Sequence, residues 1–451
     1  MSAQINTTKL NELAQQHDYK ALRAELTDMF DIDVAAFIEE LPDEEQLLVF
    51  RLLTKDQAMN VFAEFSPDVQ QHIIKSITDK EISTLIEQLA VDDAVDMLEE
   101  MPATLVKRVL KNSSPETRNV INQFLKYPEN SAGSIMTAEF TSLRKDITVS
   151  DALKRIRRVG EDSETIYNCY VTDDSRHLLG VVTVKRILLA KDNQIIQDLM
   201  EEDVISVSTV ADREDVANLM DKYDLISLPV VDAENRLVGI VTIDDAVDVI
   251  QKEATEDFHK MSTISPNDKP YFKTGIFTMA KNRIFWLLIL MISGIITGKI
   301  LGVYEEAFSV VPLLVTFIPM LTDTGGNAGS QSSTLVIRGM AVGEINMKDL
   351  PAVIWKEFRV SFIVAVPLAL LNYLRIVLFN PESGRVGLVV SLAMICTVLL
   401  ANIVGCTLPM IAKLLKADPA LMAAPLIATL VDALSLVIYF TIALTLIPAL
   451  A

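Results

Sequence analysis

The last stretch of the chain is long, apolar and interrupted by a single acid. From Leu421 to Ala451 the only formally charged residue is Asp432. About 20 predominantly apolar residues cross a bilayer, so this stretch is long enough to span one. An isolated acid in such a span costs at least ~2.5 kcal/mol on insertion scales, and it normally faces a bundle interior, a partner or an aqueous path. Two interpretations of Asp432 stay open: a protonated or hydrogen-bonded packing residue, or a cation site on a permeation path.

The charges of the chain are segregated between its two halves. The sequence has 451 residues and a formal net charge of −20, yet half of it is hydrophobic. From Tyr271 onward the chain has 12 Lys and Arg and 9 Asp and Glu, a formal net charge of +3. The first 270 residues therefore carry a formal net charge of −23. Such acidity argues against a nucleic-acid partner, which would favour a basic surface. It suits divalent cations, although a solvated acidic surface also explains it.

The N-terminus and the cysteines carry little further information. Residues Met1–Leu10 contain no apolar core of signal-peptide length, so we expect the acidic half to stay in the cytoplasm. The three cysteines show neither metal-ligand spacing nor a disulfide pattern. We therefore expect a cytoplasmic acidic half followed by a hydrophobic half in the cell membrane.

The acidic half begins with a repeat. From Pro42 to about residue 113 the chain repeats every 12 residues, and most blocks open on a Ser, Thr or Asp and close on apolar residues. A Ser, Thr or Asp before an apolar run is a helix-start signal. Short helices that cannot bury a face alone stack on their neighbours, which predicts an all-α superhelical domain over residues 1–128.

Residues 129–250 contain two copies of one pattern. Tyr170–Asp174 followed by Gly180–Val184 matches Pro229–Asp232 followed by Gly239–Asp245, with corresponding positions 59 residues apart. Each copy predicts strand, polar turn, strand and helix, with a preceding helix at 149–159 or 211–222. The pattern resembles a tandem pair of CBS domains, over 129–200 and 201–250, which usually form modules that sense adenine nucleotides or ions.

The resemblance to CBS domains implies a weak nucleotide site. Thr242 and Asp245 of the second copy match the pair that holds a ribose in nucleotide-binding relatives. The first copy has Thr183 and Arg186 at those positions, so its acid is missing. ATP therefore stays an open possibility.

A helical pattern connects this module to the hydrophobic half. It runs from about residue 244 to 268, and Asp245, Asp248 and Glu256 share roughly one face of it. Clustered like charges either stay in water or bind cations. We interpret residues 251–270 as a connecting helix that acts as a lever between the two halves.

The hydrophobic half, residues 271–451, predicts five membrane spans at 284–304, 308–336, 354–379, 386–412 and 421–449. Lys281 and Arg283 precede the first span, and Lys413 and Lys416 follow the fourth. The positive-inside rule then places the N-terminus in the cytoplasm and the C-terminus outside. Gly294, Gly298 and Gly302 recur every four residues, a spacing that allows close helix packing.

The second predicted span contains a glycine-rich polar run, Asp323–Gln331, that includes Gly325, Gly326 and Asn327. Irregular backbone at membrane depth is tolerated only inside protein or around water. The run is therefore either a loop at the membrane surface or a pore-lining break in the span. We favour the break because apolar sequence continues on both sides.

Two motifs of the hydrophobic half resemble the MgtE family of magnesium transporters. One runs from Pro319 through Gly325–Gln331 to Ile337–Gly339, and the other comprises Asp418–Leu421 and Pro425–Asp432. The order of parts also matches that family: a helical N domain, paired CBS domains, a connecting "plug" helix and five spans. The resemblance implies a homodimeric, Mg²⁺-selective, channel-like transporter in which Asp432 and Ala428 of each subunit face a shared pore.

The resemblance also implies regulatory Mg²⁺ sites on the acidic half. Cytosolic Mg²⁺ would neutralise opposed acids and lock the soluble parts and the plug helix against the pore. The acids that correspond to the family's gating residues are Asp92, Asp96, Glu214, Asp221, Asp224, Asp245, Asp248, Glu253, Glu256, Asp257 and Asp418.

Two other function classes remain to be weighed. The same architecture suits another divalent ion such as Co²⁺ or Mn²⁺, because oxygen ligands favour hard ions without excluding Mn²⁺. A membrane-anchored CBS sensor without transport would need neither Asp432 nor the glycine-rich run. We expect no enzymatic activity, since the sequence shows no nucleophile–base pair and no phosphate-binding loop.

Overall fold

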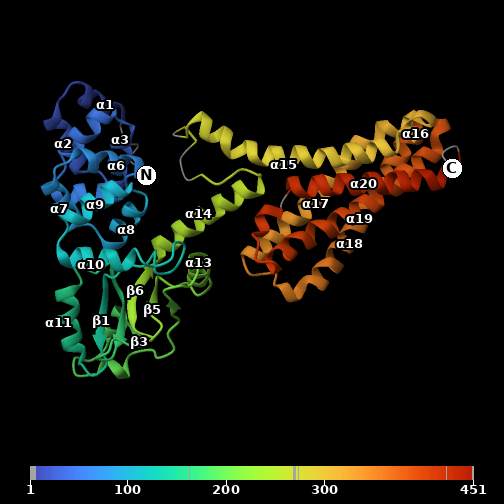
Figure 1. The fold of residues 1–451 in the computed structure, drawn as a ribbon. Helices are drawn as coiled ribbons and strands as arrows, with labels where there is room; N and C mark the ends of the chain where they lie inside the picture. The colour runs from blue at the N-terminus through green and yellow to red at the C-terminus, as the bar shows by residue number, and fades with distance from the viewer. Residues whose placement is uncertain (1–6, 162, 268–270, 273, 423, 449–451) are drawn as a thin grey trace. The chain divides into compact units, whose positions relative to one another are not determined.

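The computed structural model describes residues 7–161, 163–267, 271–272, 274–422 and 424–448. The chain divides into two compact units, Met1–Ile250 and Gln251–Ala451. The first unit contains the helical repeat and the duplicated α/β module, and the second contains the long apolar helices (Figure 1).

The N-terminal part is a stack of short helices that follows the 12-residue repeat. Ten consecutive helices begin 12 residues apart, which confirms the predicted period and extends it to the start of the described chain. The helices of this part are α1 Thr7–Gln15, α2 Tyr19–Thr27, α3 Asp31–Glu40, α4 Asp43–Phe50, α5 Lys55–Ala63, α6 Pro67–Ser76, α7 Asp79–Ile86, α8 Val91–Glu99, α9 Ala103–Asn112 and α10 Pro115–Phe124.

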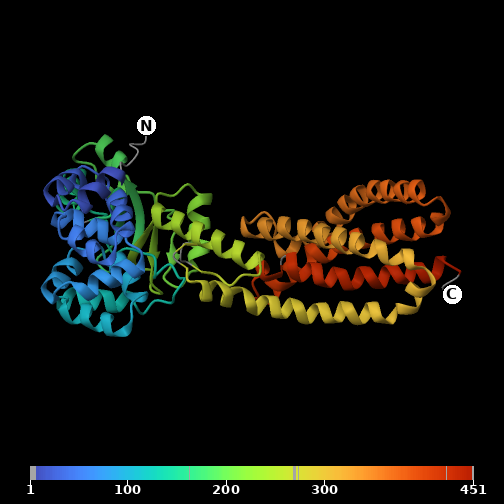
Figure 2. The ribbon, with the colours of Figure 1, turned by 90° about the horizontal axis from the view of Figure 1, so that it is seen from above.

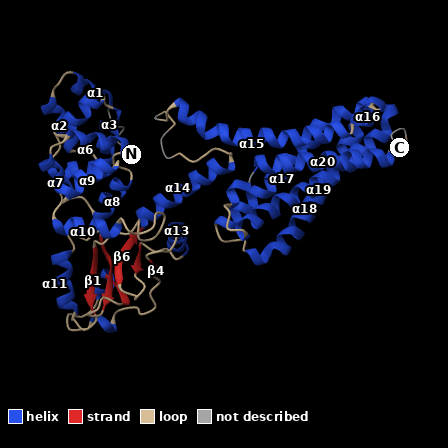
Figure 3. Cartoon of the chain, viewed as in Figure 1, coloured by secondary structure: helices blue, strands red, loops and turns tan. Residues whose placement is uncertain are grey.

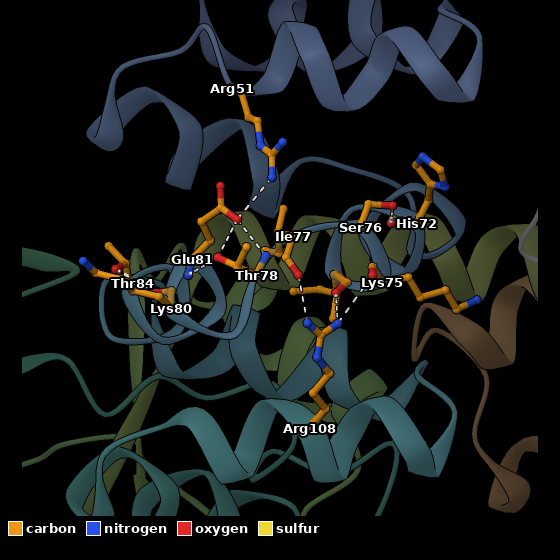
Figure 4. A network of polar contacts seen from close by, with 11 residues as sticks. Arg51, His72, Lys75, Ser76, Ile77, Thr78, Lys80, Glu81, Thr84 and Arg108 are labelled. Atoms are coloured by element: carbon orange, nitrogen blue, oxygen red, sulfur yellow. Dashed lines mark hydrogen bonds and ion pairs between the residues drawn. The ribbon is translucent and has the colours of Figure 1, made fainter.

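Side chains from later repeats cap the ends of earlier helices. Arg108 on α9 donates to the carbonyl oxygens of Ile74 (2.9 Å) and Ile77 (2.8 Å), where α6 ends (Figure 4). Glu81 closes a capping box with Thr78 at the start of α7 and also accepts from Arg51 at 3.2 Å. Because helix termini leave backbone groups without intrahelical partners, these bonds fix how neighbouring repeats stack.

The duplicated module forms two three-stranded sheets with the same topology, drawn red in Figure 3. In each sheet the first strand runs parallel to the second, and the second runs antiparallel to the third. The strands are β1 Phe140–Arg144, β2 Thr165–Thr172, β3 Leu178–Thr183, β4 Val207–Ser208, β5 Ser227–Val231 and β6 Leu237–Thr242. The sequence had not predicted the short first strands, β1 and β4.

The strand register confirms the duplication. Tyr170 pairs with Val181 in the first sheet, and Pro229 pairs with Ile240 in the second, with the predicted offset of 59 residues. The surrounding helices are α11 Val149–Val159, α12 Val184–Leu189 and α13 Arg213–Lys222. The two copies are joined by a hydrogen bond between the Tyr170 hydroxyl and Ser227 Oγ at 2.7 Å.

Helix α14, Ile243–Met261, follows β6 and continues past Ile250, where the first unit ends. It is shorter than the helix predicted to reach residue 268. It ends because Thr263 adopts a left-handed backbone conformation (φ 53°) and the Ile264 N–H turns back to the His259 carbonyl. Residues 268–270, the end of the predicted connecting segment, lie outside the described residues.

The second unit is a bundle of long helices. Helix α19 packs against α17, α18 and α20, and α15 lies beside α20 (Figures 1 and 2). The helices of this unit are α15 Ile276–Val303, α16 Glu305–Val310, α17 Ile318–Ala341, α18 Leu350–Phe379, α19 Gly384–Leu414 and α20 Ala424–Leu446. Short 3₁₀ turns at Pro312–Phe317, Met347–Asp349, Pro381–Ser383 and Pro419–Met422 connect them.

Four of the described helical segments are long and apolar enough to cross a membrane. They are Ile276–Val303, Met347–Phe379, Gly384–Leu414 and Pro425–Leu446. They correspond to the first, third, fourth and fifth predicted spans. The second predicted span, 308–336, is divided among α16, a 3₁₀ turn and α17.

The predicted break in the second span is wrong. Helix α17 runs without interruption from Ile318 to Ala341, through the whole glycine-rich run. Its glycines are contact points between helices. A Cβ on Gly325 would lie 2.6 Å from Thr397 Cγ2, and one on Gly329 would lie 2.7 Å from Ile427 Cγ2. The run therefore allows α19 and α20 to approach α17 closely, as small residues do in membrane bundles.

The closest approach is between Gly405 on α19 and Gly329 on α17. A Cβ on Gly405 would lie 2.2 Å from the Gly329 carbonyl oxygen. By contrast, Cβ atoms on Gly294, Gly298 and Gly302 of α15 would meet nothing within 4 Å among the described residues. The small-residue packing predicted for α15 is therefore absent within this part of the structure.

Replacing Gly405 by alanine should destabilise the bundle. The new methyl group would force α17 and α19 apart, and such overpacking costs about 1–3 kcal/mol. We expect a lower unfolding temperature for Gly405→Ala in detergent. Gly384→Ala is the matched control, because a Cβ on Gly384 meets nothing within 4 Å. Equal unfolding temperatures for the two variants would contradict the close helix crossing.

Candidate cation sites

A cavity of about 450 Å³ lies between α17 and α20. Its walls are formed by two polar or small-residue faces, one on each helix. The lining residues are Pro319, Thr322, Asp323, Gly326, Asn327, Ser330, Pro425, Ala428 and Asp432. Four of the five residues predicted from the sequence to line a pore, Asp432, Ala428, Gly326 and Asn327, therefore share this cavity.

The fifth, Gly325, lies on another face of α17. It is buried, and a Cβ there would meet Thr397 and Val431 rather than the cavity. Gly326 faces α20 instead, where a Cβ would lie 3.3 Å from the Ala428 Cβ. Gly325 thus packs the bundle, whereas Gly326 forms part of the cavity wall.

Asp432 is half-buried, and its carboxylate makes no hydrogen bond or ion pair with any residue in the described ranges. Thr322 was not predicted to line a pore, and Asp323 and Ser330 were predicted only as part of the glycine-rich run Asp323–Gln331. Asp323, Asn327 and Ser330 follow one another at intervals of four and three residues, which places them on one face of a continuous helix, and Thr322 adjoins Asp323 at the edge of that face. The helical periodicity of these polar residues is present in the sequence, but a broken span does not predict that they share a face.

Acids of the first unit gather where α8 meets the duplicated module. Burial and the nearby carboxylates of Asp93 and Asp245 together raise the pKa of Asp92 to about 8. Asp92 Oδ1 is buried and has no hydrogen-bond partner among the residues described. Burial likewise raises the pKa of Asp245 to about 6, with contributions from Asp244, Asp96 and Glu164.

This acidic contact combines predicted and unexpected residues. Asp92, Asp96 and Asp245 were predicted from the sequence, whereas Asp93 and Glu164 were not. Burial and neighbouring acids raise the pKa of both of the latter. Glu164 is far from α8 in sequence, and no local pattern marks it. As arranged here, the described residues contain no group of three or more His, Cys, Asp or Glu that could hold a metal ion.

The remaining predicted acids of the first unit are exposed. They are Glu214 and Asp221 on α13, Asp224 just beyond its end, and Asp248 on α14. Thr242 and Asp245, the predicted ribose pair, bond to each other, with Thr242 Oγ1 donating to Asp245 Oδ2 at 2.7 Å. Asp245 therefore belongs both to the predicted nucleotide site and to the acidic contact.

A lysine joins two predicted acids in the second unit. Lys260 Nζ lies 2.5 Å from Glu256 Oε1 on the same helix and 2.5 Å from Asp418 Oδ2 near the start of α20. Asp418 Oδ1 also accepts from the Ala420 N–H at 2.8 Å. Asp257 lies close by, where burial and the Asp418 carboxylate raise its pKa. Glu253, two turns before Lys260, also lies near Asp257.

Three family profiles match consecutive parts of the chain. The MgtE intracellular N domain matches residues 29–130, and the CBS domain matches residues 132–193 and 196–252. The MgtE profile, described as a divalent cation transporter, matches residues 318–442, which include both walls of the cavity.

Full-length relatives extend these matches. The chain is 36% identical over 444 residues to the magnesium transporter MgtE of Thermus thermophilus, covering 98% of each chain. It is 32% identical over 428 residues to the Bacillus subtilis magnesium transporter MgtE, covering 95% of this chain and 94% of the relative.

Solved structures match the cytosolic part. A crystal structure of the cytosolic domain of the Mg²⁺ channel MgtE in complex with ATP is similar with a TM-score of 0.52 and 36% identity. The match covers 54% of this chain and 99% of that one. The soluble part of a magnesium transporter gives the same TM-score at 28% identity, covering 55% of this chain and 98% of that one.

A helical N domain, paired CBS domains and a bundle of apolar helices define a multi-pass membrane protein with a divalent cation transporter domain. The chain belongs to the MgtE family of magnesium transporters. The relatives that share its whole length are named as transporters rather than enzymes.

The raised pKa of Asp92 predicts a pH-dependent stability. A carboxyl whose folded-state pKa lies above its unfolded value stabilises the fold at low pH, and this contribution is lost as pH rises from about 4 to about 8. In buffer free of divalent cations, Asp92→Asn should raise the unfolding temperature at pH 8 by at least ~2 °C, the shift given by about 1 kcal/mol. At pH 4, where this loss has only begun, the substitution should have a much smaller effect. The exposed variant Asp203→Asn should show no such gain, and an equal gain at both pH values would contradict the assignment.

Proposed function

We propose that this chain forms a homodimeric, Mg²⁺-selective, channel-like transporter that carries Mg²⁺ inward down its electrochemical gradient. The observation that carries the proposal is the Asp432 carboxylate, which has no protein partner among the described residues and faces the cavity between α17 and α20. An acid in an apolar bundle marks an ion path more often than a packing position.

The size of the cavity suits a hydrated magnesium ion. Mg²⁺ gives up its waters reluctantly and is commonly bound through one or two carboxylates with several waters retained. Six waters occupy roughly 180 Å³ at about 30 Å³ each. The cavity volume of about 450 Å³ therefore leaves room for the ion with its water shell. Carboxylate and hydroxyl oxygens on its walls would bond to these waters, weakly enough to let the ion leave.

The incomplete wall of the cavity supports a dimer. Among the described residues, those that line the cavity belong to α17 and α20 alone. A second copy placed against this face would supply the opposite wall and bring two Asp432 carboxylates to one ion. An inside-negative potential would then drive entry with roughly 2.3 kcal/mol per charge per 100 mV, about doubled for a divalent ion.

The topology completes the proposal. We count α17 as the remaining span, which gives five, with the N-terminal domains in the cytoplasm and the C-terminus outside. The predicted domains at 1–128, 129–200, 201–250, 251–270 and 271–451 stay part of the proposal. Thr242 and Asp245 of the CBS pair would hold the ribose of ATP, and the similar cytosolic domain in complex with ATP supports testing this.

Regulation would act through the acids of the cytosolic unit and the connecting helix. Buried carboxylates such as Asp92 are costly when charged, so a cation or a proton that neutralises them stabilises their contact with the CBS pair. Mg²⁺ can close the pore only through a higher affinity for the closed state. At the end of α14, the Lys260 ammonium already pairs with both Glu256 and Asp418, so Mg²⁺ would compete with a side chain there.

The test is Mg²⁺ uptake into proteoliposomes by the wild type, Asp432→Asn and Asp432→Ala. We expect both variants to lose uptake by more than about tenfold, because a carboxylate near a divalent ion contributes on that order even in water. Glu344→Gln, an exposed acid after α17 and outside the cavity, is the matched control and should transport normally.

The alternatives predict different outcomes. Undiminished uptake by folded Asp432 variants would place the permeation site elsewhere. Preferred uptake of Co²⁺ or Mn²⁺ would change the assigned ion but keep the pore. A wild type that carries no divalent cation would favour a membrane-anchored CBS sensor.

A further inference from the structure

A second acid, Asp323, lines the cavity from the helix opposite Asp432. It lies on α17, its side chain is exposed, and no hydrogen bond or ion pair joins its carboxylate to the residues described here. From the sequence, Asp323 was predicted to lie in a break in the second span or in a loop at the membrane surface. Because α17 is a continuous helix, Asp323 instead has a defined position along the cavity.

Close contacts between α17 and α20 fix that position. A Cβ on Gly329 would touch Ile427, one on Gly326 would touch Ala428, and one on Gly325 would touch Val431. The residue numbers fall on α17 as they rise on α20, so the two helices run antiparallel.

The same register places Asp323 opposite Asp432. Asp323 precedes Gly326 by three residues, and Asp432 follows Ala428 by four. With a rise of 1.5 Å per residue, the two acids lie within about 2 Å of the same level along the helices. The two helices therefore present one carboxylate each to the same part of the cavity.

Two unneutralised carboxylates at one level of an apolar bundle repel each other and are costly unless a cation lies between them or close to them. Neither acid has a lysine or arginine partner among the described residues. The cavity wall also carries the hydroxyls of Thr322 and Ser330 and the amide of Asn327, which can bond to waters around an ion. A hydrated divalent cation meets all of these groups at once, because it offers two positive charges and a shell of hydrogen-bond donors.

We propose that Asp323 is a second cation-binding carboxylate of the pore, acting at the level of Asp432. The inference rests on the proposed transport function and adds a residue to its site. Each subunit then contributes two acids, one from α17 and one from α20, and the ion is held through its water shell by both helices.

The test compares the Mg²⁺ concentration dependence of uptake by the wild-type chain, Asp323→Asn, Asp323→Ser and Asp323→Glu. The Asn and Ser variants should raise the KM for Mg²⁺ by roughly tenfold, the effect of one carboxylate about 6 Å from a divalent ion in water. Asp323→Glu keeps the charge and should stay within about threefold of wild type on the same basis. Glu344→Gln removes an acid outside the cavity and should leave KM unchanged.

The outcomes separate this inference from the proposed function. Normal KM values for both Asp323→Asn and Asp323→Ser, with uptake still lost in Asp432→Asn, would overturn the role of Asp323 alone. An equal rise of KM in Asp323→Glu would also overturn it, because shape rather than charge would then matter. Absence of Mg²⁺ uptake in the wild type would instead overturn the transport function on which the inference depends. Since Asp323 is exposed and packs no core, all three variants should insert normally, as size-exclusion chromatography would check.

Discussion

Two carboxylates without a protein partner among the described residues face one cavity in the helix bundle, and the packing of the surrounding helices holds them there despite the free-energy cost of burying charge. Asp432 and Asp323 belong to different helices, so α17 and α20 must stay close and in register. The glycines of α17 make this possible, because any side chain at Gly325 or Gly329 would collide with α19 or α20. Because α17 is a continuous helix, the polar residues of its glycine-rich run lie on one hydrophilic face toward the cavity.

Other acids of the chain, which would be unfavourable if left charged and unpaired, are stabilised in two different ways. At the contact of α8 with the CBS pair, burial raises the pKa of Asp92 to about 8, so a proton is retained at neutral pH. At the end of α14, the Lys260 ammonium bridges Glu256 and Asp418. In the proposed mechanism Mg²⁺ competes with protons at the first place and with lysine at the second, while the cavity offers it carboxylates with no such competitor. In that mechanism, regulation and permeation would depend on the same competition for carboxylates.

Features with a strong local signal could be predicted from the sequence. The 12-residue repeat predicted the period of the helix starts from Asp43 to Pro115, and the 59-residue duplication predicted the offset between corresponding strands of the two sheets. Gly325 was predicted to belong to a pore-lining break, whereas it lies in the continuous helix α17, because glycines at membrane depth suggest broken backbone unless the packing partners are known. Glu164 and Asp93 joined the acidic contact only in the folded unit, since their proximity to Asp92 and Asp245 depends on tertiary structure. Short strands such as Val207–Ser208 leave no periodic pattern to detect.

In the proposed transporter, the cavity between α17 and α20 binds a divalent cation through the carboxylates of Asp432 and Asp323. Mn²⁺ also accepts oxygen ligands, and its anomalous scattering would locate it in crystals of the full chain. The account predicts an anomalous peak inside the cavity, beside Asp432 and Asp323, that disappears in Asp432→Asn. Ordered Mn²⁺ at the cytosolic acids with an empty cavity, in protein that transports the ion, would contradict it.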